Sequence, residues 1–153
     1  MKPLLKDYLY VIAQGGLLVL YLADWPLFEM PTSPIIFWVA LAMIWVGILI
    51  GIMAMAQLNK NLSPFPTPKS DAQLVQTGLY KYIRHPIYTG ILLAALSYAF
   101  FIGSSFKLLI FLLLLTLFYF KSKYEEKKLK LKFPDYEGYM KTTGRFLPKI
   151  SAK

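Results

Sequence analysis

The sequence contains no cysteine and a single histidine, and this scarcity excludes several kinds of active site. Without cysteine, no disulfide framework, thiol nucleophile or thiolate metal centre can form. We expect no metal site, because the adjacent Glu125 and Glu126 diverge by about 100° on a helix and do not complete a ligand set with His85. The sequence also has no glycine-rich phosphate loop, no dinucleotide fingerprint, and no serine in a strand–turn–helix elbow.

What the sequence does contain is apolar residues gathered in blocks. The chain is 57 % hydrophobic, and four runs without Asp, Glu or Arg cover residues 8–23, 35–58, 87–102 and 106–120. About 20 apolar residues span a bilayer, so the second run is long enough alone and the other three need flanking residues. Buried helices of a soluble fold are the alternative, but they would carry polar residues along one face, and residues 108–115 have none. We therefore predict an all-α, integral membrane helical bundle of about four transmembrane helices with a cytoplasmic C-terminal helical tail.

The charges are unevenly distributed along the chain. Only 8 residues are acidic against 17 Lys and Arg, which gives a net charge of +9. Cations precede the first run, lie between the second and third, and follow the fourth, whereas loop 24–34 carries Asp24 and Glu29 with no Lys or Arg. By the positive-inside rule, both termini and the central loop face the cytoplasm. Such a charged face attracts anionic membrane lipids, and we expect no nucleic-acid partner. The first run lacks the small residue of an A-x-A cleavage site, so we expect a retained helix.

The chain forms one structural domain in two unequal parts. We predict an N-terminal transmembrane helix pair over residues 1–58, and a linker, a C-terminal transmembrane hairpin and a cytoplasmic tail over 59–153. The proline-rich segment 63–68 should be extended, because residues before proline avoid the α region. Residues 71–82 should form a short surface helix or turn, interrupted near Gly78. A tight turn at 103–105 precedes a helix that runs from Phe106 until Pro134 stops it, and a short helix follows over 135–141.

Three polar clusters lie at the cytoplasmic ends of the predicted helices. They comprise Tyr80, Arg84, His85 and Tyr88; Glu125 and Glu126; and Tyr136, Tyr139 and Arg145. The hairpin returns the chain to the face from which it started, so Pro86 and Phe120 should lie at a similar depth. Proline is favoured at the first position of a helix, so the first cluster should sit at a helix N-terminus.

Each cluster also has a purely structural interpretation. His85 could cap the third helix, Arg84 could bind a lipid phosphate, and the tyrosines could form an interfacial belt. Glu126 could pair with Lys130 one turn further along a solvated helix. Taken together, however, the clusters favour a site, because a chain with so few carboxylates places two of them opposite an Arg-His pair.

Two stretches of sequence carry recognisable motifs in combination. The first reads Leu74-Val75-x-x-Gly78-x-Tyr80-x-x-x-Arg84-His85-Pro86-x-Tyr88-x-Gly90, and the second contains Glu125-Glu126-x-x-Leu129, Phe133, Tyr136, Tyr139 and Arg145-Phe146-x-Pro148. With these motifs, residues 58–148 resemble the isoprenylcysteine carboxyl methyltransferase and phospholipid methyltransferase family of integral membrane enzymes. The helices before residue 58 carry no such motif.

The resemblance implies transfer of a methyl group from S-adenosylmethionine to a lipophilic acceptor at the cytoplasmic face of the membrane. Carried over by motif, the cofactor-binding residues are Tyr80, Arg84, His85, Pro86, Tyr88, Gly90, Glu125, Glu126 and Tyr139. Arg84 suits the methionine carboxylate of the cofactor, and tyrosine faces suit its sulfonium cation. Arg145 could orient a carboxylate acceptor, whereas Glu126 or His85 could take the proton of an amine acceptor.

Two other functions remain open at the level of sequence. A membrane reductase of the sterol-reductase type has a similar C-terminal architecture and uses NADPH, although it needs further cations for the 2′-phosphate. A non-catalytic adaptor would bind anionic lipid through the basic tail and requires no particular role for His85. The sequence leaves the identity of the acceptor and the oligomeric state undetermined.

Overall fold

Five α-helices and two short 3-10 helices account for the regular structure of the described chain. A computed structural model describes residues 2–23, 25 and 27–149; Asp24, an acidic residue of the first loop, lies outside them. The helices are α1 (Leu5–Leu22), α2 (Pro34–Leu58), α3 (Pro86–Phe101), α4 (Ser105–Lys132) and α5 (Tyr136–Thr142), with η1 (Asn59–Asn61) and η2 (Gly78–Lys81) between α2 and α3. The prediction of an all-α fold is confirmed.

Membrane-spanning length and composition are found in three of these helices. They are α1, the stretch Pro34–Asn61 that includes α2, and α4, while α3 is apolar but shorter. Most of their large apolar side chains are exposed on the surface of the chain, as expected where lipid replaces water. The chain is therefore an integral, multi-pass membrane protein, as predicted.

Local sequence signals set the helix boundaries. Pro34 and Pro86 occupy the first turns of α2 and α3, where their missing N–H groups leave no bond unmade. The turn between α3 and α4 contains Gly103 at a φ of 66°, and the Ser104 hydroxyl then accepts from the Lys107 backbone N–H to cap α4. The predicted tight hairpin and the arrest of α4 before Pro134 are thus both present.

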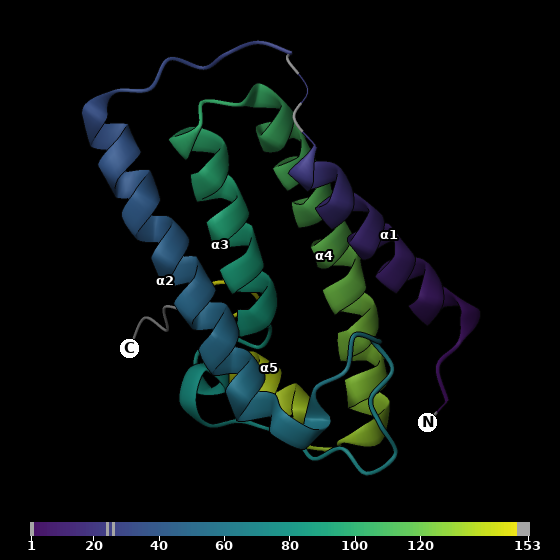
Figure 1. Cartoon of the computed structure of the whole chain (residues 1–153). Helices are drawn as coiled ribbons and strands as arrows, with labels where there is room; N and C mark the ends of the chain where they lie inside the picture. Colours follow the sequence, from purple (N-terminus) through teal and green to yellow (C-terminus); the bar gives the residue numbers. More distant parts are fainter. Residues whose placement is uncertain (1, 24, 26, 150–153) are drawn as a thin grey trace.

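The helices lie in the spatial order α2, α3, α4, α1 (Figure 1). The two N-terminal helices therefore flank the α3–α4 hairpin from opposite sides instead of lying against each other. A core centred on Leu92, Ile110, Leu114 and Phe118 joins α3 to α4.

Helices α2 and α3 approach so closely that their contact leaves no room for a Cβ atom at two positions, Gly47 and Gly90. A Cβ atom placed on Gly90 would lie 2.6 Å from the Gly47 carbonyl oxygen and 2.7 Å from the Gly51 nitrogen. Small residues allow such backbone contact between membrane helices. Gly90 therefore belongs to a helix–helix contact, and the motif-based expectation that it lines a cofactor site is not supported by its position.

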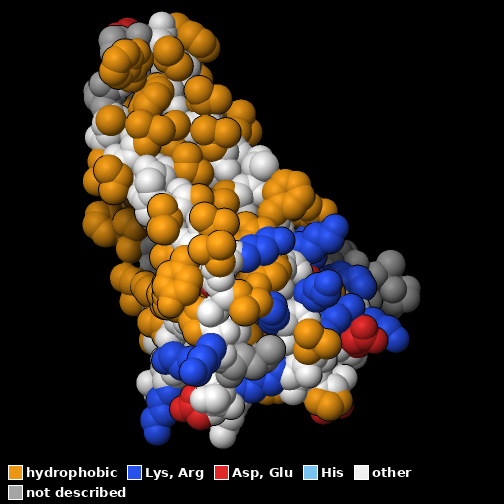
Figure 2. All heavy atoms as spheres, turned by 90° about the vertical axis from the view of Figure 1, so that its right-hand side faces the viewer, with side chains coloured by type: hydrophobic (Ala, Val, Ile, Leu, Met, Phe, Trp, Pro, Cys, Tyr) orange, Lys and Arg blue, Asp and Glu red, His pale blue; other side chains and the backbone are white. Residues whose placement is uncertain are grey.

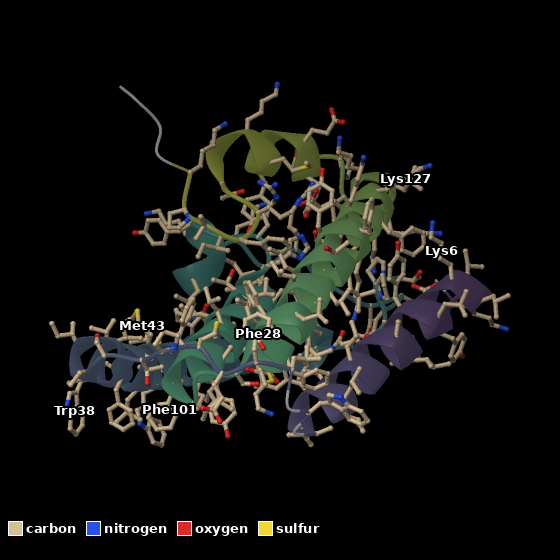
Figure 3. The ribbon with its side chains drawn as sticks, turned by 90° about the horizontal axis from the view of Figure 1, so that it is seen from above. Lys6, Phe28, Trp38, Met43, Phe101 and Lys127 are labelled. Carbon is tan, nitrogen blue, oxygen red and sulfur yellow. The ribbon has the colours of Figure 1, made fainter. Side chains whose placement is uncertain are left out.

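Charged and irregular segments gather at one end of the bundle, which we call the polar end. It contains linker 59–85, the last turns of α4, α5 and residues 143–149 (Figure 1). Figure 2 shows Lys and Arg side chains over this end, below a surface dominated by apolar groups. Seen from above in Figure 3, Lys6 and Lys127 lie on the α1–α4 side of the molecule and Trp38 and Phe101 on the opposite side.

The linker differs in part from the sequence prediction. Residues 71–77 form no helix, and the one short helix of this stretch, η2, begins at Gly78, where an interruption was predicted. Gly78 has a φ of 59°, and the side-chain oxygen of Gln57 accepts a hydrogen bond from the Leu79 backbone N–H at 2.9 Å. This bond ties the start of η2 to α2, an interaction that local propensity does not reveal.

Candidate functional site

A cavity of about 370 Å³ lies in the polar end of the bundle. Its volume is in the range of small-molecule sites. The walls come from Gln14 of α1, Leu58 of α2, linker residues 61–75, the start of α3, the last turns of α4 and α5. The polar and aromatic side chains among the lining residues are Gln14, Asn61, Ser63, Phe65, Gln73, Tyr80, Arg84, His85, Tyr88, Lys121, Glu125, Phe133, Tyr136 and Tyr139.

The Glu126 carboxylate is the centre of the ion-pair network beside this cavity. Its Oε1 lies 2.8 Å from Arg84 Nε, 3.2 Å from His85 Nε2 and 3.2 Å from Arg145 Nε, and its Oε2 lies 2.6 Å from Arg145 Nη2. Glu126 is only 3 % exposed. Two guanidinium groups stabilise the ionised carboxylate, and the carboxylate in turn fixes Arg84 and His85 at the start of α3. The alternative pairing of Glu126 with Lys130 is not formed, because Lys130 pairs with Glu137.

A second layer of contacts places Glu125 on the cavity wall. The Tyr88 hydroxyl donates to Glu125 Oε2 at 3.0 Å, and His85 Nδ1 lies 3.8 Å from the same oxygen. The His85 and Tyr88 rings stack at 5.4 Å between centroids, and Tyr88 stacks on Phe118 at 4.5 Å. Aromatic packing thus holds the histidine and the tyrosine in one orientation against the end of α4.

The C-terminal tail is attached to the residues that precede α3. The Arg84 and His85 backbone N–H groups donate to the Gly144 and Arg145 carbonyls at 2.8 and 3.1 Å, and the Gly144 N–H donates to the Tyr82 carbonyl at 3.1 Å. Arg84 Nη1 also donates to the Thr143 carbonyl. The guanidinium of Arg84 is therefore largely occupied by protein acceptors.

Three buried tyrosines pack around α5 and η2. The Tyr139 hydroxyl donates to the Tyr80 carbonyl, and the Tyr80 hydroxyl donates to the Ala54 carbonyl at 3.3 Å. Burial raises the pKa of Tyr139 to about 12 and the pKa of both Tyr80 and Tyr136 further. All three hydroxyls stay protonated at physiological pH, and those of Tyr80 and Tyr139 act as hydrogen-bond donors.

The structure brings most of the sequence-predicted site residues together. Of these, the residues that line the cavity are Tyr80, Arg84, His85, Tyr88, Glu125 and Tyr139. Pro86 and Glu126 are buried behind the wall, and Arg145 is on the far side of Glu126 with its guanidinium 5.1 Å from the Tyr119 ring centroid. Arg145 and Glu126 bond to each other and do not line the cavity, and their direct contact with a ligand stays a prediction.

Sequence reasoning missed the contributions of the linker and of α1. The Asp7 carboxylate is fully buried, and its Oδ1 accepts a hydrogen bond from the Thr67 N–H at 2.8 Å. Tyr8 contacts Phe65 edge-to-face at 5.0 Å. These contacts fold the proline-rich segment over the cavity as a wall. The only available signal was an acidic residue at the start of an otherwise apolar first helix.

Lys121 is the second residue that sequence reasoning missed. It is 1 % exposed, and its Nζ donates to Gln14 Oε1 at 2.5 Å and to the Pro64 carbonyl at 3.0 Å. It thereby joins α4 to α1 and to the linker at the cavity wall. In the sequence, Lys121 is indistinguishable from the solvated lysines that follow it.

Fold and cavity together define a multi-pass membrane protein with a cavity of small-molecule size at one end of its helical bundle. The phospholipid methyltransferase family model matches residues 35–135, more than half of the chain, and the chain belongs to this family. The family transfers methyl groups from S-adenosylmethionine, so the resemblance drawn from the motifs is confirmed.

A solved structure supports the same architecture. The chain is similar to the eukaryotic intramembrane Ras methyltransferase, isoprenylcysteine carboxyl methyltransferase, with a TM-score of 0.66 and 22 % sequence identity. The match covers 96 % of this chain and 55 % of the other, so the chain spans about half the length of that protein. At this identity the likeness concerns the fold. No curated protein matches the chain.

Proposed function

We propose that this chain transfers a methyl group from S-adenosylmethionine to a lipophilic acceptor at the cytoplasmic face of the membrane. The observation that carries the proposal is the cavity of about 370 Å³, where the ends of α3 and α4 place His85, Tyr88 and Glu125 together. The start of α1, the linker and the tail all lie at this end. The positive-inside rule assigns that end to the cytoplasm.

The residues of the cavity fit the proposed cofactor. S-adenosylmethionine supplies an activated methyl group on a sulfonium cation, and it carries an ammonium, a carboxylate, ribose hydroxyls and an adenine ring. Glu125 can accept a hydrogen bond from the ammonium or the ribose hydroxyls, and the lining rings of Tyr80 and Tyr139 are candidates to offer a face to the sulfonium cation. The apolar wall formed by Leu74, Val75 and Phe133 can cover the adenine. This donor set combines charged, aromatic and apolar groups as such a ligand requires.

The acceptor is proposed to be a lipid. Leu58, Ile87 and Ile91 line the cavity from the membrane-embedded helices α2 and α3, and polar side chains such as Tyr88, Lys121 and Glu125 line the same cavity. A lipid headgroup could therefore reach the polar wall while its acyl chains stay among apolar side chains. Positioning of the two substrates supplies most of the rate acceleration in a displacement of this kind.

The protein groups then have separate roles. For an amine acceptor, we assign proton removal to His85, with its ring held by Glu126 and stacked on Tyr88. Glu126 and Arg145 act as positioning residues through the ion-pair network. The linker wall excludes water from the reacting groups.

A labelled-methyl assay tests this proposal. The full chain, reconstituted with a total lipid extract, should transfer label from S-adenosylmethionine to a lipid fraction, and calorimetry in detergent should detect binding of S-adenosylhomocysteine. His85→Asn should reduce transfer by about a hundredfold or more while cofactor binding falls much less. Binding of NADPH, without binding of S-adenosylmethionine or S-adenosylhomocysteine, would instead identify a reductase. If none of these three compounds bound, the adaptor function would remain.

A further inference from the structure

Lys121 is a buried cation on the cavity wall that has no carboxylate partner. Among the described residues, its ammonium makes no salt bridge, and its two hydrogen-bond acceptors are the neutral Gln14 side chain and the Pro64 carbonyl. The Nζ lies 5.4 Å from the centroid of the Tyr88 ring. An ammonium has three N–H donors, so one remains after these two bonds.

The other cations at the site are already neutralised by the protein. Arg84 and Arg145 both donate to Glu126, and Arg84 also donates to the Met140 and Thr143 carbonyls. A buried ammonium without an ion-pair partner is costly, and Lys121, unlike the similarly buried Lys107, faces a cavity in which an anion could compensate it. Lys121 is therefore the cation at this cavity that is available to an anion.

The neighbouring carboxylate strengthens this argument. Glu125 follows Lys121 by one helical turn on α4, a spacing at which oppositely charged side chains commonly pair. The two charged groups do not pair here: Glu125 turns toward Tyr88 and His85, and Lys121 turns toward α1 and the linker. The cavity wall thus presents one cation and one anion at separate points, which matches a zwitterionic group.

We propose that Lys121 is the anion-binding residue of the cavity and pairs with a negatively charged oxygen of the ligand, while Glu125 pairs with the ligand's ammonium. This inference rests on the proposed function. The anionic oxygen has two possible sources that share this chemistry, the methionine carboxylate of the cofactor and the phosphate of a phospholipid acceptor. Arg84, which sequence reasoning assigned to the carboxylate, is committed to Glu126 instead.

A purely structural role for Lys121 needs a matched control, and the chain offers one in Lys107. Lys107 is 4 % exposed, donates to the Tyr21 and Ala23 carbonyls at 2.8 and 3.1 Å, and lies 5.2 Å from the Tyr21 ring centroid. It therefore has the same environment as Lys121 but lies at the opposite end of α4. Lys107→Gln should destabilise the fold and leave ligand binding unchanged.

Calorimetry of the full chain in detergent separates the two sources. The ligands are S-adenosylhomocysteine, its decarboxylated analogue, which keeps the ammonium, and phosphatidylethanolamine. If the carboxylate is the partner, Lys121→Gln should weaken the binding of S-adenosylhomocysteine about tenfold or more. The affinity for the decarboxylated analogue should stay within about twofold of wild type. Lys121→Arg should recover most of the lost affinity for S-adenosylhomocysteine.

The remaining outcomes are equally decisive. A tenfold loss confined to phosphatidylethanolamine supports Lys121 as the anion site and identifies the lipid phosphate as its partner. The inference is overturned if Lys121→Gln leaves the affinities for S-adenosylhomocysteine and phosphatidylethanolamine unchanged. It is also overturned if Lys107→Gln weakens binding by the same factor as Lys121→Gln. Failure of the wild type to bind S-adenosylhomocysteine refutes the proposed function itself, and the phosphatidylethanolamine measurement then decides the role of Lys121.

Discussion

Replacement of Glu126 by glutamine tests the ion-pair network beside the cavity most directly. The substitution preserves shape but removes the charge that two guanidinium groups share at 2.8 and 2.6 Å. The side chains of Arg84 and Glu126 are 8 % and 4 % exposed, so the remaining cation stays in a poorly solvated place. Breaking a buried pair by removing one partner costs about 3–5 kcal/mol. The Arg145 side chain is 23 % exposed, so water can solvate its unpaired charge and reduce this cost.

We therefore expect Glu126→Gln to lower the free energy of unfolding by about 3 kcal/mol. Because Arg145 holds residues 143–149 against α4, the tail should also become more sensitive to limited proteolysis. Denaturation followed by circular dichroism in detergent measures the first effect, and timed trypsin digestion measures the second. A double-mutant cycle with Arg145→Met should show a coupling energy well above the error of the single variants.

The matched control is Glu137→Gln, which removes an exposed carboxylate. Glu137 is 69 % exposed and pairs with Lys130, which is 41 % exposed, at 3.0 Å. Exposed pairs of this kind contribute little to stability, because water and salt screen the two charges. If the Glu126 variant were no less stable than the Glu137 variant and its tail equally resistant to protease, the reasoning about the buried network would be refuted.

Three further substitutions address other parts of the structure. Gly90→Ala would bring a Cβ atom to 2.6 Å from the Gly47 carbonyl oxygen and should lower the free energy of unfolding by about 1–3 kcal/mol. The cofactor affinity of the folded protein should not change, and an unchanged free energy of unfolding would contradict the close helix contact. Tyr88→Phe removes the 3.0 Å hydrogen bond to Glu125 but keeps the aromatic stacking, so S-adenosylhomocysteine should bind about three- to tenfold more weakly in calorimetry. The pKa of Tyr139 is raised by burial to about 12, so the folded state holds this proton more tightly than the unfolded chain. The contribution of this group to the free energy of unfolding is full below about pH 10 and decreases as the pH rises toward 12. Denaturation curves recorded over this pH range should show a smaller decrease for Tyr139→Phe than for the wild type. An equal decrease in both would show that the phenol does not contribute.

The arrangement of site residues at the ends of α3 and α4 could be predicted from the sequence because it follows from local rules. Two apolar runs separated by a three-residue turn must form a hairpin, and a hairpin returns the chain to the face from which it started. Arg84 and His85 at the start and Glu125 and Glu126 at the exit then meet regardless of packing detail, as the 2.8 Å contact of Arg84 with Glu126 shows. The helix boundaries followed in the same way from Pro34, Pro86 and Pro134, because proline acts on its own backbone.

The tertiary structure alone decided which side chains face the cavity and which hold the wall from behind. Gly90 shares the motif of the site, yet backbone contact with α2 places it in a helix interface. Arg145 and Lys121 are both cations of the basic tail segment, but one is neutralised by Glu126 and the other faces neutral acceptors from α1 and the linker. Charge pairing and burial depend on side-chain direction and on contacts between residues 19 to 107 positions apart, which no local pattern encodes. The sequence by itself thus determined the spans and the meeting of the helix ends, whereas the wall over the cavity and the burial of Lys121 in that wall without an ion pair among the described residues emerged only from packing in three dimensions.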